Sequence, residues 1–217
     1  MLRPKLIELT EKIIYESSLV ERMLNISIEG LLESNIEKLE NALEYENMIN
    51  KLEMEIEEMC ISMIALYQPE AKDLRTIISI LKINNDFERM GDQGTNIVYS
   101  AKFIVERPSL KPLINIKNMA NETIGMLKKS LDAYVREDVT QAREVCVFDD
   151  VIDDYRNQIV RELITYMLSD PKNIERAIEL MNIVQNLERI ADLCTNIAEN
   201  TIFIKDGIVI KHHNYNE

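Results

Sequence analysis

The sequence predicts an all-α protein built from two tandem, pseudo-symmetric three-helix bundles, with six long helices in all. Three observations support this fold class: a shortage of turn residues, apolar side chains at helical spacing, and an internal repeat. The 217 residues include only 5 glycines and 5 prolines, against an average usage of about 7 % glycine and about 5 % proline. A chain this poor in turn residues does not support the many short strands of a β-sandwich or a barrel.

Apolar residues recur every three or four positions along the first half of the chain, which is the period of an amphipathic helix. Three such stripes are present: Leu6, Leu9, Ile13, Ile14, Leu19, Met23, Leu24 and Ile28; then Leu39, Leu43, Met48, Ile49, Leu52, Ile56, Met59, Cys60, Met63 and Leu66; then Leu74, Ile77, Ile78, Leu81, Phe87, Met90, Ile97 and Phe103. We expect each stripe to form the buried face of one long helix.

The prolines mark the boundaries between these helices, because proline disrupts a helix interior. The segment Arg107–Pro112 contains two of them and is the clearest linker. Beyond it the pattern predicts helices over about 113–136 and 137–168, a turn near Pro171, and a last helix to about 205. We therefore expect a first repeat over 1–107, a second over 113–205, and a C-terminal tail over 206–217 that is extended from Ile208.

The two halves align as copies of one unit. Phe87–Ile97 matches Leu187–Ile197 at an offset of 100 residues, with six identical positions. Glu46–Asn50 corresponds to Asp149–Asp153 at an offset of 103. Small changes in loop length between duplicated units produce such a drift in offset, so the sequence predicts an internal duplication.

Each repeat carries two motifs with oxygen-bearing side chains four residues apart, which places both side chains on one helix face. In each repeat the helical corner lies midway between the two motifs, so an antiparallel hairpin brings them to the same level. Carboxylate and amide oxygens suit hard cations. The alternative is that Arg89 and Arg189 pair with these acids on a solvated surface. The candidate ligands are Glu46, Asn50, Glu88, Asp92, Asp149, Asp153, Glu188 and Asp192.

Charge and composition exclude several other classes of protein. A formal net charge of −13 disfavours binding to nucleic acid. Three cysteines without CxxC spacing indicate free, buried thiols in a reducing cytosol. No signal peptide and no long apolar run is present, so we expect a cytoplasmic protein that reaches a membrane only through partners. The two histidines, His212 and His213, lie in the tail, which argues against a di-iron oxygenase.

The stretch Ala65–Asp92 resembles the PhoU family, through Gln-Pro-x-Ala-x-Asp-Leu-Arg followed by Glu-Arg-x-Gly-Asp, and Leu187–Asp192 repeats the second motif. The resemblance implies a non-enzymatic, cytoplasmic negative regulator that links the ATPase subunit of the phosphate ABC transporter to the phosphate-sensing histidine kinase. It also implies a homodimer and metal clusters on the acidic motifs, with iron first and Mg, Mn, Ca or Zn as alternatives. Ala191 and the Leu193–Cys194 pair depart from the family pattern, and these departures bear on the affinity and the metal identity of the second site.

The resemblance passes the metal role to the acidic residues named above, with Asn50 supplying only a neutral oxygen. Asp73 and Arg75 follow the first helical corner without counterparts in the second repeat. They are candidates for partner binding, although Asp73 can simply complement the helix dipole. Two other readings stay open: a carboxylate-cluster metalloenzyme or metal-storage protein acting on phosphate compounds, and a plain helical scaffold.

Overall fold

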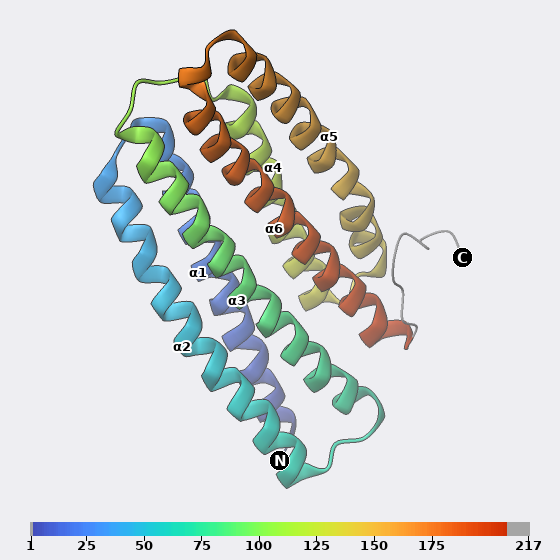
Figure 1. The fold of residues 1–217 in the computed structure, drawn as a ribbon. Helices are drawn as coiled ribbons and strands as arrows, with labels where there is room; N and C mark the ends of the chain where they lie inside the picture. Colours follow the sequence, from blue (N-terminus) through green and yellow to red (C-terminus); the bar gives the residue numbers. More distant parts are fainter. Residues whose placement is uncertain (1, 208–217) are drawn as a thin grey trace.

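The computed structural model describes residues 2–207, and this part of the chain is helical without any strand (Figure 1). The prediction of an all-α fold with six long helices is confirmed. The tail begins one residue later than predicted, because Asp206 is the last residue of the final helix. The rest of the predicted tail, residues 208–217, lies outside the described residues. The helices are α1 (Leu2–Glu33), α2 (Ile36–Tyr67), α3 (Ala71–Val105), α4 (Ile114–Arg136), α5 (Val139–Ser169) and α6 (Ile174–Asp206), with a short 3-10 turn η1 (Pro171–Asn173) before α6.

The helices form two three-helix units, α1–α3 and α4–α6, that pack together along a central seam. In this seam α3 and α6 run antiparallel and side by side (Figure 1). Helices α1 and α4 lie behind them and also touch each other. Within the described residues, α2 and α5 contact only elements of their own repeat, so they form the two outer edges of the molecule.

The first turn of each repeat shows the duplication at atomic detail. Ser34 and Glu137 both adopt left-handed backbone angles, with φ of 54° and 50°. The next residues, Asn35 and Asp138, cap α2 and α5, each side chain accepting a hydrogen bond from the backbone N–H three positions on, at 3.1 and 3.0 Å. The same turn therefore recurs 103 residues later and fixes which positions of α1 and α4 correspond.

The core is built from the predicted apolar stripes, with four exceptions. Leu66 and Leu74, on the two sides of the first corner, are 76 % and 37 % exposed, and Met48 and Ile14 also face solvent. These four predictions of burial are wrong because the stripes are wider than the faces that neighbouring helices cover. The three cysteines are buried and free, as predicted: Cys60, Cys146 and Cys194.

Two glycines of α3 set its distance from the other helices of the first repeat. A Cβ atom on Gly91 would lie 3.4 Å from the Ile49 side chain of α2, and one on Gly94 would lie 3.0 Å from the Met23 sulfur of α1. The contact between Gly91 and Ile49 places the middle of α2 opposite the acidic motif of α3. The predicted register of the first hairpin is therefore observed.

Candidate functional site

The second repeat brings its four predicted acidic residues together across the α5–α6 hairpin. Burial, helped by the negative charges of Asp192, Asp153 and Glu188, raises the pKa of Asp149 to about 7. Burial and the neighbouring Asp192 also raise the pKa of Glu188. Carboxylates from both helices thus act on one another, and the site has an excess of negative charge.

Cationic side chains balance part of this charge. The Arg156 Nε atom of α5 lies 3.8 Å from a Glu188 carboxylate oxygen of α6. Arg189 also lowers the pKa of Glu188, but burial and Asp192 outweigh both arginines. The arginines therefore compensate the negative charge of Glu188 only in part.

The first repeat brings its acidic residues together less completely. Burial is the main cause of the raised pKa of Glu88, followed by the charges of Asp92 and then Glu53. Glu46 and Asn50 lie opposite this motif by the register of the hairpin, but neither contributes to the pKa shift of Glu88. The Asn50 Oδ1 atom is buried and has no hydrogen-bond partner among the described residues. A buried oxygen without a donor is unusual in a folded protein and is suited to a cation or a water molecule.

Two acidic residues of this region were not predicted from the sequence. Glu53 lies one turn beyond Asn50 on the same face of α2, and Glu16 of α1 is fully buried. Glu53 and Glu88 add to the effect of burial on Glu16, whose pKa rises to about 9. The signal for Glu16 was present in the sequence, because it falls three residues after Ile13 and four before Val20, both of which are buried.

The donor chemistry of both hairpins fits a hard metal ion, since carboxylate and amide oxygens face one another and one amide oxygen lacks a donor. In the described residues, however, the carboxylate side chains do not converge on one metal-ion position. Within residues 2–207, no three histidine, cysteine, aspartate or glutamate side chains surround a common point that a metal ion could occupy. Metal binding therefore requires the carboxylates to rotate toward one another.

The predicted partner-binding residues lie at the start of α3, away from the acidic faces. Asp73 is exposed in the first turn of the helix. Arg75 is half-buried, and its Nε atom has no hydrogen-bond partner among the described residues. Lys72, which directly precedes Asp73, bonds the Glu137 carboxylate of the second repeat at 2.6 Å. This end of α3 is therefore connected to both repeats.

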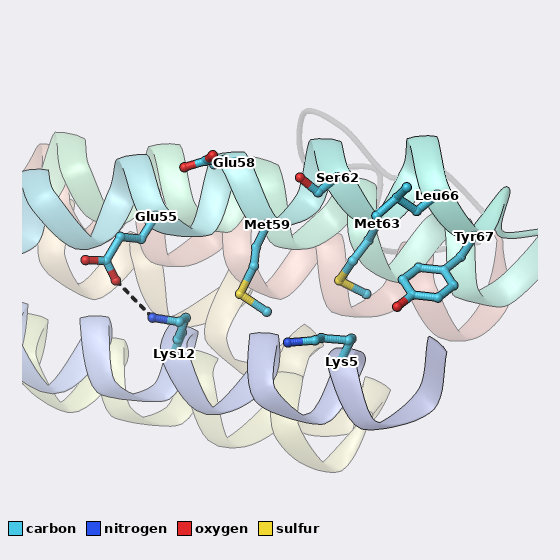
Figure 2. Close-up of a pocket in the computed structure, with 9 residues that line it drawn as sticks. All are labelled: Lys5, Lys12, Glu55, Glu58, Met59, Ser62, Met63, Leu66 and Tyr67. Carbon is cyan, nitrogen blue, oxygen red and sulfur yellow. Dashed lines mark hydrogen bonds and ion pairs between the residues drawn. The ribbon is translucent and has the colours of Figure 1, made fainter. Parts of the chain in front are cut away.

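Sequence reasoning also missed a groove of about 400 Å³ between α1 and the end of α2 (Figure 2). Methionine side chains form its floor, and an ion pair of 3.0 Å between Lys12 and Glu55 crosses one end. None of the predicted site residues lines it. The lining residues are Lys5, Lys12, Glu55, Glu58, Met59, Ser62, Met63, Leu66 and Tyr67.

The helices carry no membrane-spanning segment within the described residues, since none is both long and apolar enough. The fold and the acidic hairpins define a class of protein: an all-helical molecule with two copies of a three-helix unit, each with carboxylates facing across its second and third helices. Two matches to the PhoU domain, over residues 16–101 and 116–201, show that the chain belongs to the PhoU family.

Relatives and solved structures cover nearly the whole chain. It is 40 % identical, over 97 % of its own length and 95 % of the relative, to the phosphate-specific transport system accessory protein PhoU homolog of Aquifex aeolicus. A crystal structure of PhoU from Pseudomonas aeruginosa has a TM-score of 0.92 at 31 % identity and covers 96 % of this chain and 100 % of that one. The phosphate transport system regulatory protein PhoU of Streptococcus pneumoniae has a TM-score of 0.90 at 25 % identity and covers 98 % and 100 %. These relatives are named as accessory and regulatory proteins, not as enzymes, in agreement with the predicted non-enzymatic role.

Proposed function

We propose that this protein is a cytoplasmic negative regulator of phosphate homeostasis, which restrains high-affinity phosphate uptake and phosphate-starvation signalling. The observation that carries the proposal is the pair of PhoU domain matches, which lie one in each repeat. Full-length relatives are named as accessory proteins of the phosphate-specific transport system. The protein acts by contact with the ATPase subunit of the phosphate ABC transporter and with the phosphate-sensing histidine kinase.

The exposed start of α3 is the proposed contact for a partner. Asp73 is available to solvent, and Arg75, two residues further along α3, is half-buried. The test is a pull-down of the transporter ATPase and the kinase by the full chain. We expect the double variant Asp73→Ala/Arg75→Ala to lose at least tenfold in capture of one partner, whereas Asp132→Ala, a control on the exposed face of α4, retains it.

A deletion strain tests the regulatory part of the proposal. Loss of the gene should raise expression of a phosphate-starvation reporter in phosphate-rich medium, and the wild-type gene should restore repression. Unchanged reporter expression in the deletion strain, with neither partner captured by the purified protein, contradicts the proposal.

We also propose that the acidic hairpins bind metal ions, iron first, with Mg, Mn, Ca or Zn as the alternatives. The negative charges of Asp192, Asp153 and Glu188, which add to burial in raising the pKa of Asp149, support the second repeat as one such site. The test is the metal content of purified protein and its loss in Asp149→Asn/Asp153→Asn. Equal metal content in the two proteins contradicts a site in this hairpin.

A homodimer is the proposed assembly. Large apolar side chains stay exposed on α2 and on α5, including Leu66 and Leu168 at 76 % and 82 % exposure, and they supply apolar surface that a second copy can cover. Sedimentation velocity should give a species of twice the monomer mass of 25.2 kDa. If sedimentation velocity detects only the monomer at concentrations from about 1 to about 100 micromolar, this part of the proposal is contradicted.

A further inference from the structure

The groove between α1 and the end of α2 has a counterpart between α4 and α5. The matching first turns of the two repeats place Lys12 in register with Asn115, and Met59 in register with Glu162. Lys12 and Met59 line the groove, so Asn115 and Glu162 mark the corresponding place in the second repeat. The contacts made there show which kind of chain segment fits this part of the three-helix unit.

The linker between the repeats covers the corresponding place in the second repeat. The Lys111 side chain bonds the Glu162 carboxylate and is only 1 % exposed, and Asn115 approaches the same carboxylate at 3.5 Å. The neighbouring Leu110 packs against the apolar core. An adjacent leucine and lysine from non-helical chain therefore occupy this end of the α4–α5 pair.

The first repeat leaves the same place open among the described residues, because helix replaces the linker. By the register of the repeats, the first residue of α4, Ile114, corresponds to Glu11, whereas α1 already begins at Leu2. The extra turns of α1 form one wall of the groove, which includes Lys5. A groove of about 400 Å³ is therefore present where the second repeat holds a leucine and a lysine.

The floor of the open groove is apolar and adaptable. Figure 2 shows Met59 and Met63 pointing from α2 toward α1, with Leu66 and Tyr67 beyond them at the end of α2. Leu66 is 76 % exposed, so an apolar side chain that enters the groove removes apolar surface from water. Methionine side chains are flexible and recur on surfaces that bind varied partners. The floor therefore suits the aliphatic residue of a peptide.

The rim of the groove carries an unpaired negative charge. Lys12 bonds Glu55 at 3.0 Å, and Lys5 bonds Glu8 at 2.7 Å, so both lysines of the groove already have an acidic partner. Glu58 is exposed and takes part in no ion pair among the described residues. Charge complementarity therefore favours a lysine or an arginine in a segment that binds here.

We propose that this groove binds an extended peptide segment of a partner protein, in which an apolar residue stands next to a lysine or an arginine. The apolar side chain lies on the methionine floor, and the cation pairs with Glu58 at the rim. Extended segments are commonly recognised through surfaces that accept their individual side chains. The groove is separate from Asp73 and Arg75, and the inference rests only on the part of the proposed function in which the protein acts by contact with partners.

The linker itself supplies the probe for a test. A fluorescein-labelled peptide with the sequence of residues 106–113 carries Leu110 and Lys111 between Pro108 and Pro112. Each proline fixes a backbone angle, which reduces the conformational entropy lost on binding. Fluorescence anisotropy with the full-length protein should show saturable binding. The Lys111→Glu form of the peptide should bind about tenfold more weakly.

Matched substitutions locate the bound peptide. Leu66→Ser and Glu58→Lys change exposed residues of the groove, and each should weaken binding about fivefold or more. Met54→Ser and Glu57→Lys make the same changes at exposed positions of α2 outside the groove and should keep the affinity within about twofold. Met59→Glu supplies the carboxylate that the second repeat has at this position and should strengthen binding about threefold or more.

Three outcomes overturn the groove as a peptide site. The first is the absence of saturable binding to the wild type at peptide concentrations up to about 1 mM. The second is equal affinity of the wild type, Leu66→Ser and Glu58→Lys. The third is a loss of binding in Glu162→Gln but not in the groove variants, which shows that the peptide displaces the linker instead.

The pull-down of the transporter ATPase and the kinase succeeds or fails independently of this experiment. Peptide binding in the groove without capture of either protein contradicts the proposed partners and supports the groove as a contact surface. Capture of a partner without peptide binding overturns the groove and leaves the proposed function in place.

Discussion

The Lys72 ammonium group lies 2.6 Å from a Glu137 carboxylate oxygen and joins the start of α3 to the end of α4. Lys205 of α6 approaches the other oxygen of Glu137 at 3.4 Å. At the opposite end of the seam, an Arg176 guanidinium nitrogen donates a 2.8 Å hydrogen bond to the carbonyl of Pro108. Polar contacts therefore tie the two repeats, or the linker between them, at both ends of the α3–α6 pair.

Glu137→Gln tests the contact between repeats. The hydrogen bond from Lys72 holds the pKa of Glu137 below its usual value near 4.5. A lowered pKa in the folded state stabilises the protein above the unfolded pKa, and this contribution is lost as the pH falls through the folded pKa. The pair is partly exposed, so we expect a loss of about 0.5–1 kcal/mol at pH 7 and low salt, and less at high salt. Urea unfolding of the variant and the wild type at low and at high salt measures this loss of stability. Equal stability of the two proteins shows that the contact between Lys72 and Glu137 contributes nothing.

Glycine substitutions test how closely the helices approach. On Gly30, a Cβ atom would lie 2.7 Å from Leu39 and 3.2 Å from a backbone oxygen, so Gly30→Ala should destabilise by about 1–3 kcal/mol. On Gly91 the nearest atom is at 3.4 Å, and the second repeat has Ala191 at this position, so Gly91→Ala should be tolerated. Gly125 has nothing within 4 Å, and Gly125→Ala should stabilise by up to about 1 kcal/mol through helix propensity. Thermal unfolding of the three variants gives the order, and a Gly30→Ala protein as stable as Gly125→Ala contradicts it.

Glu16 should make the metal-free protein less stable as the pH rises. Burial raises its pKa from 4.5 to about 9, with Glu53 and Glu88 as the acidic groups that face it. Between pH 4.5 and about 9 the folded state keeps the proton on Glu16 while the unfolded state loses it. The free energy of unfolding is therefore unaffected by this group below pH 4.5 and decreases as the pH rises toward about 9. In buffer with a chelator at pH 8, Glu16→Met should be more stable than the wild type by about 1–3 kcal/mol, and the difference should shrink at pH 5. Denaturant unfolding at the two pH values measures this, and a difference independent of pH contradicts a buried, protonated Glu16.

The sequence was sufficient for the fold because its signals are local. Helical spacing, the prolines and the repeat at offsets of 100 and 103 residues indicated six long helices, and the contact between Gly91 and Ile49 confirmed the register of the first hairpin. The errors concern positions such as Leu66 and Met48, whose burial depends on which neighbouring helix covers them. Spacing along one helix does not contain that information.

The acidic hairpins were predicted for the same reason, since motifs four residues apart share a helix face. Glu16 was missed because it belongs to no motif. Its acidic neighbours Glu53 and Glu88 lie 37 or more positions away in the sequence, so only the packing of the helices brings them near it. A break in an apolar stripe, compared with Met119 in the other repeat, is the signal that could have identified it.

An ion pair with a buried lysine on the linker should contribute more than an exposed pair between helices. The Lys111 side chain is 1 % exposed and bonds Glu162 of α5, which Asn115 also approaches at 3.5 Å. Glu162→Gln leaves a buried ammonium group without its counter-charge and should destabilise by about 3 kcal/mol. The control is Glu21→Gln, which breaks an exposed 2.9 Å pair with Lys128 and should cost less than about 1 kcal/mol. Urea unfolding ranks the two, and equal losses show that burial of Lys111 is not what makes its ion pair important.

Neutralising the second acidic hairpin should have opposite effects with and without metal. Without metal, Asp149 is half-buried among Asp192, Asp153 and Glu188, and its pKa of about 7 reflects burial and repulsion. Asp149→Asn removes one of the repelling charges, so the metal-free variant should unfold at a higher temperature than the wild type.

A ligand that binds only the folded state adds stability by mass action. Saturating Mn²⁺ should therefore raise the wild-type melting temperature by several degrees, about 1–3 kcal/mol in stability at 10- to 100-fold excess over Kd, and the variant by less. Differential scanning calorimetry with a chelator, and with saturating Mn²⁺ in its place, gives the two melting temperatures of each protein. An equal Mn²⁺ shift in Asp149→Asn and wild type contradicts a metal ligand at this position, whereas a lower metal-free melting temperature for the variant contradicts the repulsion.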